Sequence, residues 1–269
     1  MEIKELVAKI NKAIEDLSYP EDMVGEAMAY AMVDGQAKRI RPLLFLMVIE
    51  MLGEDPFKYI NYALAIELIH NYSLVHDDLE CMDNDKYRRG KLTVHYKYGE
   101  AIGVLVGDGL LNYAYEILTE NINDQAGKNF SSYLGKMAGS YGLILGQSMD
   151  MDDKISIDNI EEMYDKKTCY LIKAASKGAG LVTGQDEDVL EKLEDFGYCL
   201  GMAFQLKDDI LDYDQDKDAG KKTVATLLGK EETTERASLL TKRAIDILKE
   251  FEDSSDLIYL TSDLLDRKI

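Results

Sequence analysis

The sequence predicts an all-α protein, a single-domain helical bundle, and three observations support this. Apolar residues recur at steps of three and four along almost all of the 269 residues. Only three prolines are present, and alternating stretches rich in Val, Thr and Ile are nearly absent. No linker rich in Pro, Gly or Ser divides the chain. We therefore expect residues 1–269 to form one domain.

Composition limits the classes of function. Asp and Glu outnumber Lys and Arg by 51 to 31, a net charge of −20, which should repel nucleic acid and anionic lipid. The three cysteines show no CxxC spacing, so neither a disulfide framework nor a thiolate zinc site is expected. Residues 1–17 lack the apolar core of a signal peptide, and Glu50 interrupts the best apolar run, Leu43 to Ile49. We expect a cytoplasmic protein without nucleic-acid binding or stable membrane insertion.

The helical pattern is interrupted at intervals by short polar segments. Breaks are expected at residues 18–22, 53–56, 83–99, 120–128, 152–158, 183–188, 213–222 and 252–256. Before the second break, residues 35–42 read GQAKRIRP, with three cations at a helix start near Pro42. Helix N-termini attract anions, so this segment is either a phosphate site or a solvated basic turn.

The helix expected over residues 61–78 ends in a pair of carboxylates. Its apolar face holds Tyr62, Ala65, Ile66, Ile69 and Tyr72, and another face carries Glu67, His70, Ser73 and Asp77. Asp77 and Asp78 at a helix C-terminus oppose the helix dipole unless a cation is present. Carboxylate oxygens are ligands for Mg²⁺, and the Arg88–Arg89 pair that follows suits phosphate. The segment predicts a metal and phosphate site; a surface acidic cluster is the alternative.

The middle of the chain carries weaker signals. Gly103, Gly107 and Gly109 lie in a helical pattern over residues 99–118, which indicates close helix packing or a nearby ligand. Asp108 stands alone among these apolar residues, and we expect it to be buried with a structural role. In GQSMDMD, residues 146–152, a glutamine and an aspartate share a helix face. Lys-Lys-Thr at residues 166–168 is on its own more typical of a solvated face.

A second acidic helix end reads GMAFQLKDDILDYDQD, residues 201–216. Asp208, Asp209 and Asp212 are spaced so that several oxygens converge on one side of a helix, and Gln205 extends the same stripe backwards. This arrangement can chelate a divalent ion. Two lysines, at 221 and 222, follow in the next break. Two aspartate-rich helix ends about 130 positions apart are explained together by a diphosphate held through metal ions.

These motifs resemble those of the trans-isoprenyl diphosphate synthases, the polyprenyl synthetase family, over nearly the whole chain. HDDLECMDNDKYRRGKLTVH is similar to the first aspartate-rich motif of the family and FQLKDDILD to the second. GQAKRIRP resembles its GGKRxRP segment, GQSMD its GQxxD, and LIYLTSDLLDRKI its terminal helix. The resemblance implies an α-helical bundle of the isoprenoid synthase type around a deep central cavity, usually in a homodimer.

The resemblance also implies an activity and a set of residues. Family members condense isopentenyl diphosphate with an allylic diphosphate, such as dimethylallyl or geranyl diphosphate, and release pyrophosphate. The implied Mg²⁺ ligands are Asp77, Asp83, Asp208 and Asp212, supported by Asp78 and Asp209. The isopentenyl diphosphate pocket would comprise Lys38, Arg41, His70 and Arg89. Around the allylic substrate lie Arg88, Lys167 and Lys222 at the phosphates, and Thr168 and Gln205 at the carbocation.

The length of the product is expected from the residues before the first motif. In the family, the fourth and fifth positions before the first aspartate form the cavity floor, which places Ser73 and Tyr72 there. An aromatic Tyr72 with DDxxxxD spacing resembles the bacterial farnesyl diphosphate synthases, so farnesyl diphosphate is the expected product. Alternatives are a geranyl or geranylgeranyl diphosphate synthase, or a catalytically weak binding subunit of a heteromeric enzyme. A terpene cyclase would lack the second motif, and a phosphohydrolase would not explain it.

Some features depart from the family pattern. Ala37 replaces a usual glycine, Cys169 replaces a small residue, and the loop after Asp212 is short, so one of two phosphate-binding lysines has no counterpart. Asp77 and Asp83 are six positions apart and cannot share a face of a straight helix. We therefore expect the helix to end or distort between them.

Overall fold

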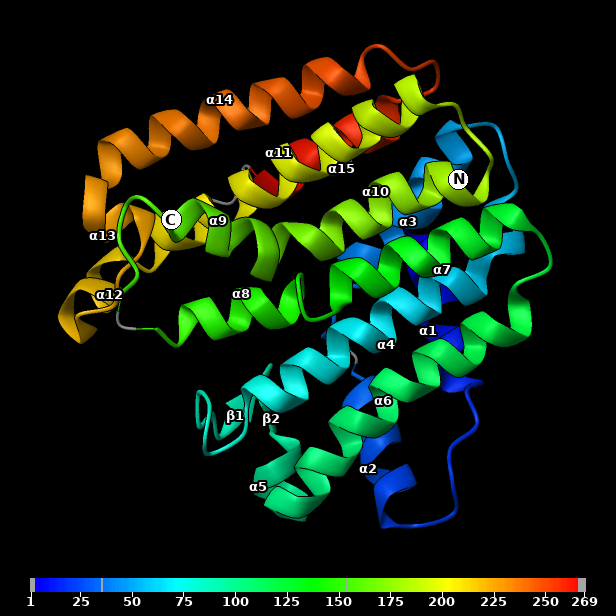
Figure 1. Ribbon diagram of the computed structural model, residues 1–269, viewed down its shortest axis with the longest axis horizontal. Helices are drawn as coiled ribbons and strands as arrows, with labels where there is room; N and C mark the ends of the chain where they lie inside the picture. Colours follow the sequence, from blue (N-terminus) through cyan, green and yellow to red (C-terminus); the bar gives the residue numbers. More distant parts are fainter. Residues whose placement is uncertain (1–2, 35, 153, 266–269) are drawn as a thin grey trace. The chain divides into compact units, whose positions relative to one another are not determined.

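The computed structural model describes residues 3–34, 36–152 and 154–265 and shows a chain of helices with one short β-hairpin (Figure 1). The all-α prediction is confirmed. Contacts within the chain define two compact units. Unit 1 comprises Met1–Leu46 with Pro56–Asp124, and unit 2 comprises Met47–Asp55 with Gln125–Ile269. That residues 1–269 act as a single domain stays a prediction.

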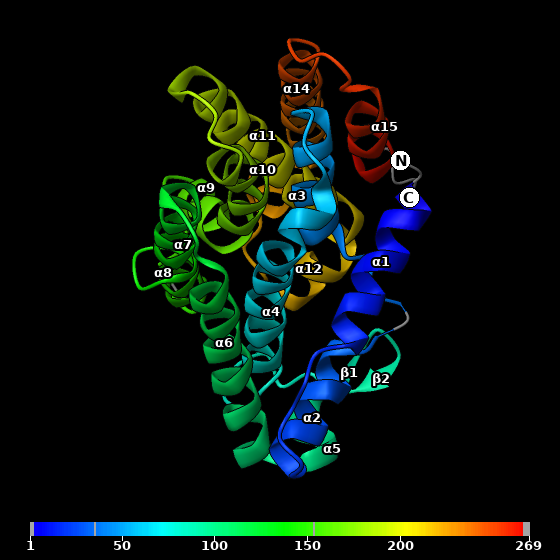
Figure 2. The ribbon, with the colours of Figure 1, turned by 90° about the vertical axis from the view of Figure 1, so that its right-hand side faces the viewer.

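Unit 1 is built around helix α4. Its elements are α1 (Ile3–Glu15), α2 (Met23–Met32), the first part of α3 (Ile40–Met51), the 3₁₀ turn η1 (Pro56–Tyr59), α4 (Ile60–Asp77), β1 (Tyr87–Arg88), β2 (Lys91–Leu92), α5 (Val94–Tyr98) and α6 (Glu100–Asn121). α4 packs against α1, α2 and α6, and Figure 2 shows α4 and α6 side by side. The five apolar residues expected on its inner face are all buried, so the interpretation of this helix is confirmed.

Glycines allow α4 and α6 to approach closely. A Cβ atom added at Gly107 would lie 2.0 Å from Nε2 of His76 on α4. A Cβ at Gly103 would lie 2.9 Å from Cδ2 of Leu79, just beyond the end of α4. The prediction of close helix packing is confirmed. The prediction for Asp108 is wrong, because its side chain is 66% exposed.

The segment 83–99, expected to be a break, contains the hairpin and α5. Arg89 (φ 50°) and Gly90 (φ 76°) form a two-residue connection in which both residues adopt positive φ, as a type I′ turn requires. Glycine adopts this conformation without steric cost. The RRG sequence therefore encodes a tight turn that presents two arginines. The break expected at 213–222 also contains a helix, α12 (Tyr213–Ala219).

The basic segment before α3 is only partly a surface feature. Arg39 is 3% exposed; its Nη1 donates to Glu67 Oε1 at 2.7 Å, and its other nitrogens donate to the carbonyl of Met32 and to Asn11. Both charges of the Arg39–Glu67 pair are buried, so breaking it would leave an uncompensated charge. Arg39 is thus a structural residue, and neither the basic turn nor the polar stripe of α4 is uniformly solvated. Gly35, which opens GQAKRIRP, lies outside the described residues.

Unit 2 is built around helix α11. Its elements after α3 are α7 (Gln125–Ala138), α8 (Leu143–Asp150), α9 (Ile160–Tyr164), the π-helical turn η2 (Asp165–Cys169), α10 (Tyr170–Val182), α11 (Glu187–Leu211), α12, α13 (Val224–Leu228), α14 (Lys230–Leu248) and α15 (Ser255–Leu265). α11 packs against both α10 and α14 (Figure 1). Residues 266–269 of the expected terminal helix lie outside the described residues. Within the described residues, the cysteines at 81, 169 and 199 form no disulfide.

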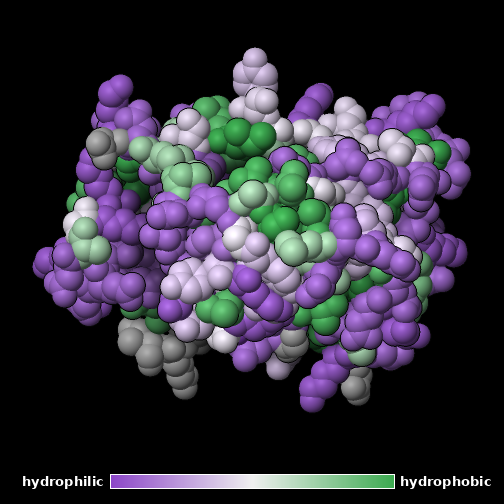
Figure 3. Space-filling model, turned by 90° about the horizontal axis from the view of Figure 1, so that it is seen from below, coloured by the Kyte–Doolittle hydropathy of each residue, from purple (hydrophilic) through white to green (hydrophobic). Residues whose placement is uncertain are grey.

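One helix of unit 1 is long and apolar enough to cross a membrane by length and composition alone. This is α6, which the sequence-based expectation overlooked. Its packing against α4 is also what a core helix of a folded unit shows, and it carries acidic residues at Glu100, Asp108, Glu116 and Glu120. Figure 3 shows one face of the molecule, where hydrophilic side chains predominate and hydrophobic ones lie among them.

Candidate active site

The first aspartate motif lies where α4 ends. The helix stops at Asp77, the chain turns, and the backbone N–H of Asp83 donates to the carbonyl of Asp77 at 2.9 Å. The prediction that the helix ends between the two aspartates is confirmed. Asp77 is half-buried and Asp83 is exposed. Carboxylates at a helix C-terminus, where the dipole favours cations, provide a donor set that suits Mg²⁺.

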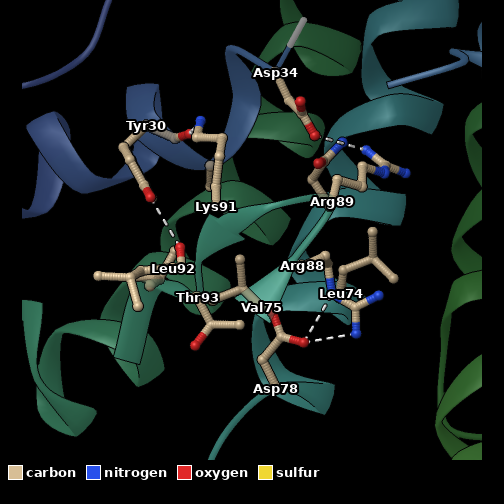
Figure 4. A pocket seen from close by; sticks show the side chains of 13 residues that line it. Tyr30, Asp34, Leu74, Val75, Asp78, Arg88, Arg89, Lys91, Leu92 and Thr93 are labelled. Atoms are coloured by element: carbon tan, nitrogen blue, oxygen red, sulfur yellow. Dashed lines mark hydrogen bonds and ion pairs between the residues drawn. The ribbon is translucent and has the colours of Figure 1, made fainter. Parts of the chain in front are cut away.

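Asp78, the second aspartate of the pair, faces inward. It is 3% exposed, and its Oδ1 accepts from Arg88 Nε at 2.7 Å and lies 2.6 Å from Arg88 Nη2 (Figure 4). Burial raises the pKa of Asp78, and the bond from Arg88 opposes this shift. Asp85 lies 3.6 Å from the same guanidinium. The Asp78–Arg88 pair therefore attaches the hairpin to the end of α4.

The rest of the hairpin is attached to the end of α2. Arg89 Nη1 lies 3.3 Å from Asp34 Oδ2 (Figure 4), and Lys91 Nζ donates to the carbonyls of Tyr30 and Val33. The hydroxyl of Tyr30 donates in turn to the carbonyl of Leu92 at 2.9 Å. Both arginines of RRG thus contact carboxylates, and each is about one-third exposed.

A cationic group surrounds His70 on α4. Arg41 Nη1 lies 3.0 Å from His70 Nε2. The pKa of His70 is well below its ordinary value because of burial, then because of Arg41, Arg89, Arg88 and Arg39 in decreasing order. Unit 1 therefore brings together four of the predicted phosphate-binding residues: Arg41, His70, Arg88 and Arg89. Lys38 is exposed, and the described part of the chain shows it in no hydrogen bond or ion pair.

The two predicted chain-length residues are one turn before the first motif. Tyr72 is 6% exposed, and its ring packs edge-on against His76 with centroids 5.9 Å apart. Burial, with Tyr115 and Asp77 nearby, raises the pKa of Tyr72 to about 12. Ser73 is half-buried and donates to the carbonyl of His70. Tyr72 is therefore a packed aromatic side chain rather than a solvated one.

The second aspartate motif lies at the end of α11, in unit 2. Asp208 is half-buried, Asp212 is exposed, and Asp209 is only 3% exposed. The two more accessible carboxylates are again at a helix C-terminus, which suits a cation. Within the described residues, three or more His, Cys, Asp or Glu side chains are nowhere gathered as a ready-made metal cluster. The ligand set therefore stays a prediction.

A cavity of about 160 Å³ in unit 2 contains several predicted site residues. It is lined by Asp150, Met163, Tyr164, Lys167, Thr168, Gln205, Asp209, Lys221, Lys222 and Thr223. Lys167 forms an ion pair with Asp150 of GQSMD. The Thr168 hydroxyl donates to Gln205 Oε1 at 2.8 Å. Lys167 and Thr168 lie on the π-helical turn η2, a geometry that occurs frequently at functional sites.

Sequence reasoning missed several residues of this cavity. The sequence-based assignment gives Asp150 a helix face but no role, and it omits Tyr164 and Thr223. Tyr164 is four positions before Thr168, so the helical period could have placed it on the same side. Thr223 and Asp209 of the second motif line the same cavity only because of tertiary structure, which leaves no local signal.

The chain is similar to known proteins along most of its length. The polyprenyl synthetase family model matches residues 22–246. The farnesyl diphosphate synthase of Geobacillus stearothermophilus is 40% identical over 210 residues, which cover 76% of this chain and 70% of the relative. The chloroplastic geranylgeranyl pyrophosphate synthase of Catharanthus roseus is 35% identical, over 94% of this chain and 77% of the relative.

Solved structures of related enzymes share the fold. An FPP/GFPP synthase from Zymomonas mobilis superposes with a TM-score of 0.90 at 32% identity, covering 98% of this chain and 97% of the other. Geranyltransferase from Helicobacter pylori, in complex with magnesium and isoprenyl diphosphate, gives a TM-score of 0.82 at 28% identity, covering 98% and 94%. The fold is therefore that of the isoprenoid synthases.

Fold, motifs and relatives define the class of this protein as a prenyltransferase of isoprenoid biosynthesis. The chain belongs to the polyprenyl synthetase family.

Proposed function

We propose that this enzyme condenses isopentenyl diphosphate with dimethylallyl or geranyl diphosphate, giving mainly farnesyl diphosphate and pyrophosphate. The observation that carries the proposal is the cavity lined by Lys167, Thr168 and Gln205 together with Asp209 of the second aspartate motif. Asp77, Asp83, Asp208 and Asp212 would hold Mg²⁺, which neutralises the leaving diphosphate when bound. We also propose a cytoplasmic homodimer, although the Catharanthus relative is named as chloroplastic.

The allylic C–O bond breaks with both electrons leaving on the diphosphate. Lys167, Lys222 and Arg88 supply positive charge to the phosphate oxygens. The carbocation left behind requires fixed dipoles and the exclusion of water. The Thr168 hydroxyl donates a hydrogen bond to Gln205, so its oxygen lone pairs remain for the cation, and Gln205 is fixed by its bonds to Thr168 and Asp209.

The second substrate is bound by direct contacts in unit 1. Lys38, Arg41 and Arg89 would contact the diphosphate of isopentenyl diphosphate, with His70 beside them. Because the low pKa of His70 keeps its imidazole neutral, Nε2 accepts from Arg41 and holds that guanidinium in place. The double bond then attacks the allylic cation, a new C–C bond forms, and a proton leaves to the released pyrophosphate.

An assay decides between this proposal and its rivals. Purified protein is supplied with Mg²⁺, isopentenyl diphosphate and each allylic diphosphate in turn, and products are separated by chain length. We expect farnesyl diphosphate as the main product and its loss in Asp77→Ala. A cyclic or hydroxylated product would favour a terpene cyclase, and activity only with a second protein would favour a binding subunit. No prenyl product at all would contradict the proposal.

Product length depends in this proposal on Tyr72. Tyr72→Ala removes a buried aromatic ring, so longer products, such as geranylgeranyl diphosphate, should replace much of the farnesyl diphosphate. Tyr62→Ala is the matched control, because Tyr62 is a buried tyrosine on the same helix ten positions earlier. It should lower stability without lengthening the product. Unchanged product length in Tyr72→Ala would show that another residue forms the cavity floor. The alternative of a geranylgeranyl diphosphate synthase would then be favoured.

A further inference from the structure

Both oxygens of the Asp209 carboxylate accept hydrogen bonds from other residues of unit 2. Oδ1 accepts from Gln205 Nε2 at 3.1 Å. Oδ2 accepts from the Tyr164 hydroxyl at 2.7 Å and from the backbone N–H of Val224 at 3.1 Å. Tyr164, Asp209 and Val224 are all buried, at 4%, 3% and 0% exposure. Asp209 therefore joins α11 to the end of α9 and to the start of α13.

The start of α13 is bonded to the segment that carries the two lysines of the cavity. Thr223 caps this helix in a capping box with Thr226, and the Thr226 hydroxyl donates to the carbonyl of Lys221 at 2.9 Å. Lys221 and Lys222 directly precede the cap and line the same cavity as Lys167. The bond from Val224 N–H to Asp209 thus fixes the segment that presents these lysines.

The geometry also argues against a metal ion at Asp209. Mg²⁺ requires near-octahedral coordination at short distance, and it would have to displace donors from a carboxylate that solvent scarcely reaches. Displacement would leave the hydroxyl of Tyr164 buried without an acceptor, or the N–H of Val224 with only its longer contact to the Tyr164 oxygen, 3.3 Å away, which is unfavourable. Asp208 and Asp212, in contrast, are accessible at the helix end.

The first motif shows the same division within unit 1. Asp78, the second aspartate of its pair, is buried and bound to Arg88 of the hairpin, while Asp77 is only half-buried and Asp83 is exposed. In each motif the second aspartate therefore attaches a neighbouring phosphate-binding segment to the helix that carries the motif.

We propose that Asp209 is a positioning residue rather than a magnesium ligand, and that together with Tyr164 it fixes the start of α13 and the lysines that precede it. The role of those lysines rests on the proposed function. The attachment of α13 by Asp209 is a property of the unliganded chain. Experiments can therefore contradict the attachment and the proposed function independently of each other.

Hydrogen exchange of the unliganded protein tests the attachment. Tyr164→Phe and Asp209→Ala should each speed exchange of the Val224 amide at least tenfold, because its acceptor is misplaced or lost. Tyr133→Phe is the matched control, since it removes a partly buried hydroxyl that lies 3.3 Å from Glu194 elsewhere in unit 2. Unchanged Val224 exchange in both variants would overturn the proposal. If Asp209→Ala does not fold, Tyr164→Phe decides alone.

Calorimetry separates positioning from metal binding. The probe is MgCl₂ titrated in the presence of pyrophosphate. Asp208→Asn and Asp212→Asn should weaken Mg²⁺ binding tenfold or more, whereas Asp209→Asn, which retains an oxygen acceptor, should stay within threefold of the unmodified protein. An Asp209→Asn loss as large as that of Asp208→Asn would overturn the proposal. If the unmodified protein binds no Mg²⁺ with pyrophosphate, the proposed function fails, and Val224 exchange still decides the attachment.

Kinetics gives a third readout. Tyr164→Phe should raise the KM for the allylic diphosphate severalfold while the KM for isopentenyl diphosphate is unchanged, because only the lysines of unit 2 are misplaced. Tyr133→Phe should change neither. Equal changes in both KM values for Tyr164→Phe would indicate general destabilisation and contradict the positioning role.

Discussion

At the scale of single residues, His70 is unusual because it is surrounded by arginines. Arg41 is in contact with its ring, and Arg89, Arg88 and Arg39 also lower its pKa. Two carboxylates, Asp77 and Glu67, lie on the same helix as His70, but Glu67 is paired with Arg39. A protonated imidazole would add a further positive charge to this group. The folded protein therefore keeps His70 neutral.

This arrangement predicts a loss of stability in mild acid. Below about pH 6.5 the unfolded chain takes up a proton at His70 that the folded chain does not, so the free energy of unfolding falls as pH decreases, by at most about 1.4 kcal/mol per pH unit. Denaturant unfolding at pH 7.5 and 5.5 measures the change. His70→Gln should reduce the difference between the two pH values; an equal difference in this variant would contradict the assignment.

At the scale of elements, the contact between α4 and α6 depends on particular glycines. Gly107 faces the ring of His76, which also packs against Tyr72 and lies 3.1 Å from the carbonyl of Val104. Gly109, one of the nearby glycines, faces the flexible end of Met28, and an added Cβ there would lie 3.0 Å from its sulfur. Met28 can therefore move away from a methyl group added at Gly109 more easily than His76 can move away from one added at Gly107.

Alanine substitution should separate these positions. Gly107→Ala should lower the free energy of unfolding by about 1–3 kcal/mol, because the added methyl group displaces His76. Gly109→Ala should be nearly neutral or stabilising by up to about 1 kcal/mol, because alanine favours the helix and the methionine can move. Thermal or denaturant unfolding measures both. Equal effects would show that α6 adjusts as a whole.

At the scale of the whole molecule, charge is the dominant feature. The net charge of −20 is spread over a surface on which many ion pairs are exposed, such as Lys12–Asp16 and Arg243–Asp195. Exposed pairs of this kind contribute little to stability. Repulsion among the excess carboxylates opposes folding, and dissolved salt screens it.

Salt should therefore stabilise the protein. Raising NaCl from 10 to 150 mM shortens the screening length from about 30 Å to about 8 Å, and the Tm should increase. A scan in sodium chloride without Mg²⁺ measures this effect apart from metal binding. A lower Tm in salt would mean that attractive pairs outweigh the repulsion.

The sequence predicted the helices and the aspartate motifs well because both follow local periodicity. The end of α4 before Asp83 could be predicted since six positions do not fit one helix face. The hairpin could not, because its two-residue strands are too short for an alternating pattern, and α12 lies in a segment too polar to show an apolar face. The burial of Arg39, Asp78 and Asp209 depends on partners in other elements of the fold, which spacing alone does not reveal.

The π-helical turn at Asp165–Cys169 lets the chain tolerate the loss of one residue at this place. A turn with i→i+5 bonds accommodates one more residue than an α-helical turn, and an ordinary helix rotates about 100° per residue. Deleting one residue from this turn would allow a regular α-helix with little rotation of the preceding segment, because residues three apart share a helix face as residues four apart do, and Tyr164 would still lie on the side of Thr168. Deleting one residue here, at Asp165 or Lys166, should therefore lower the free energy of unfolding less than deleting one residue from the regular α-helix α10, where the helix on one side rotates by about 100°.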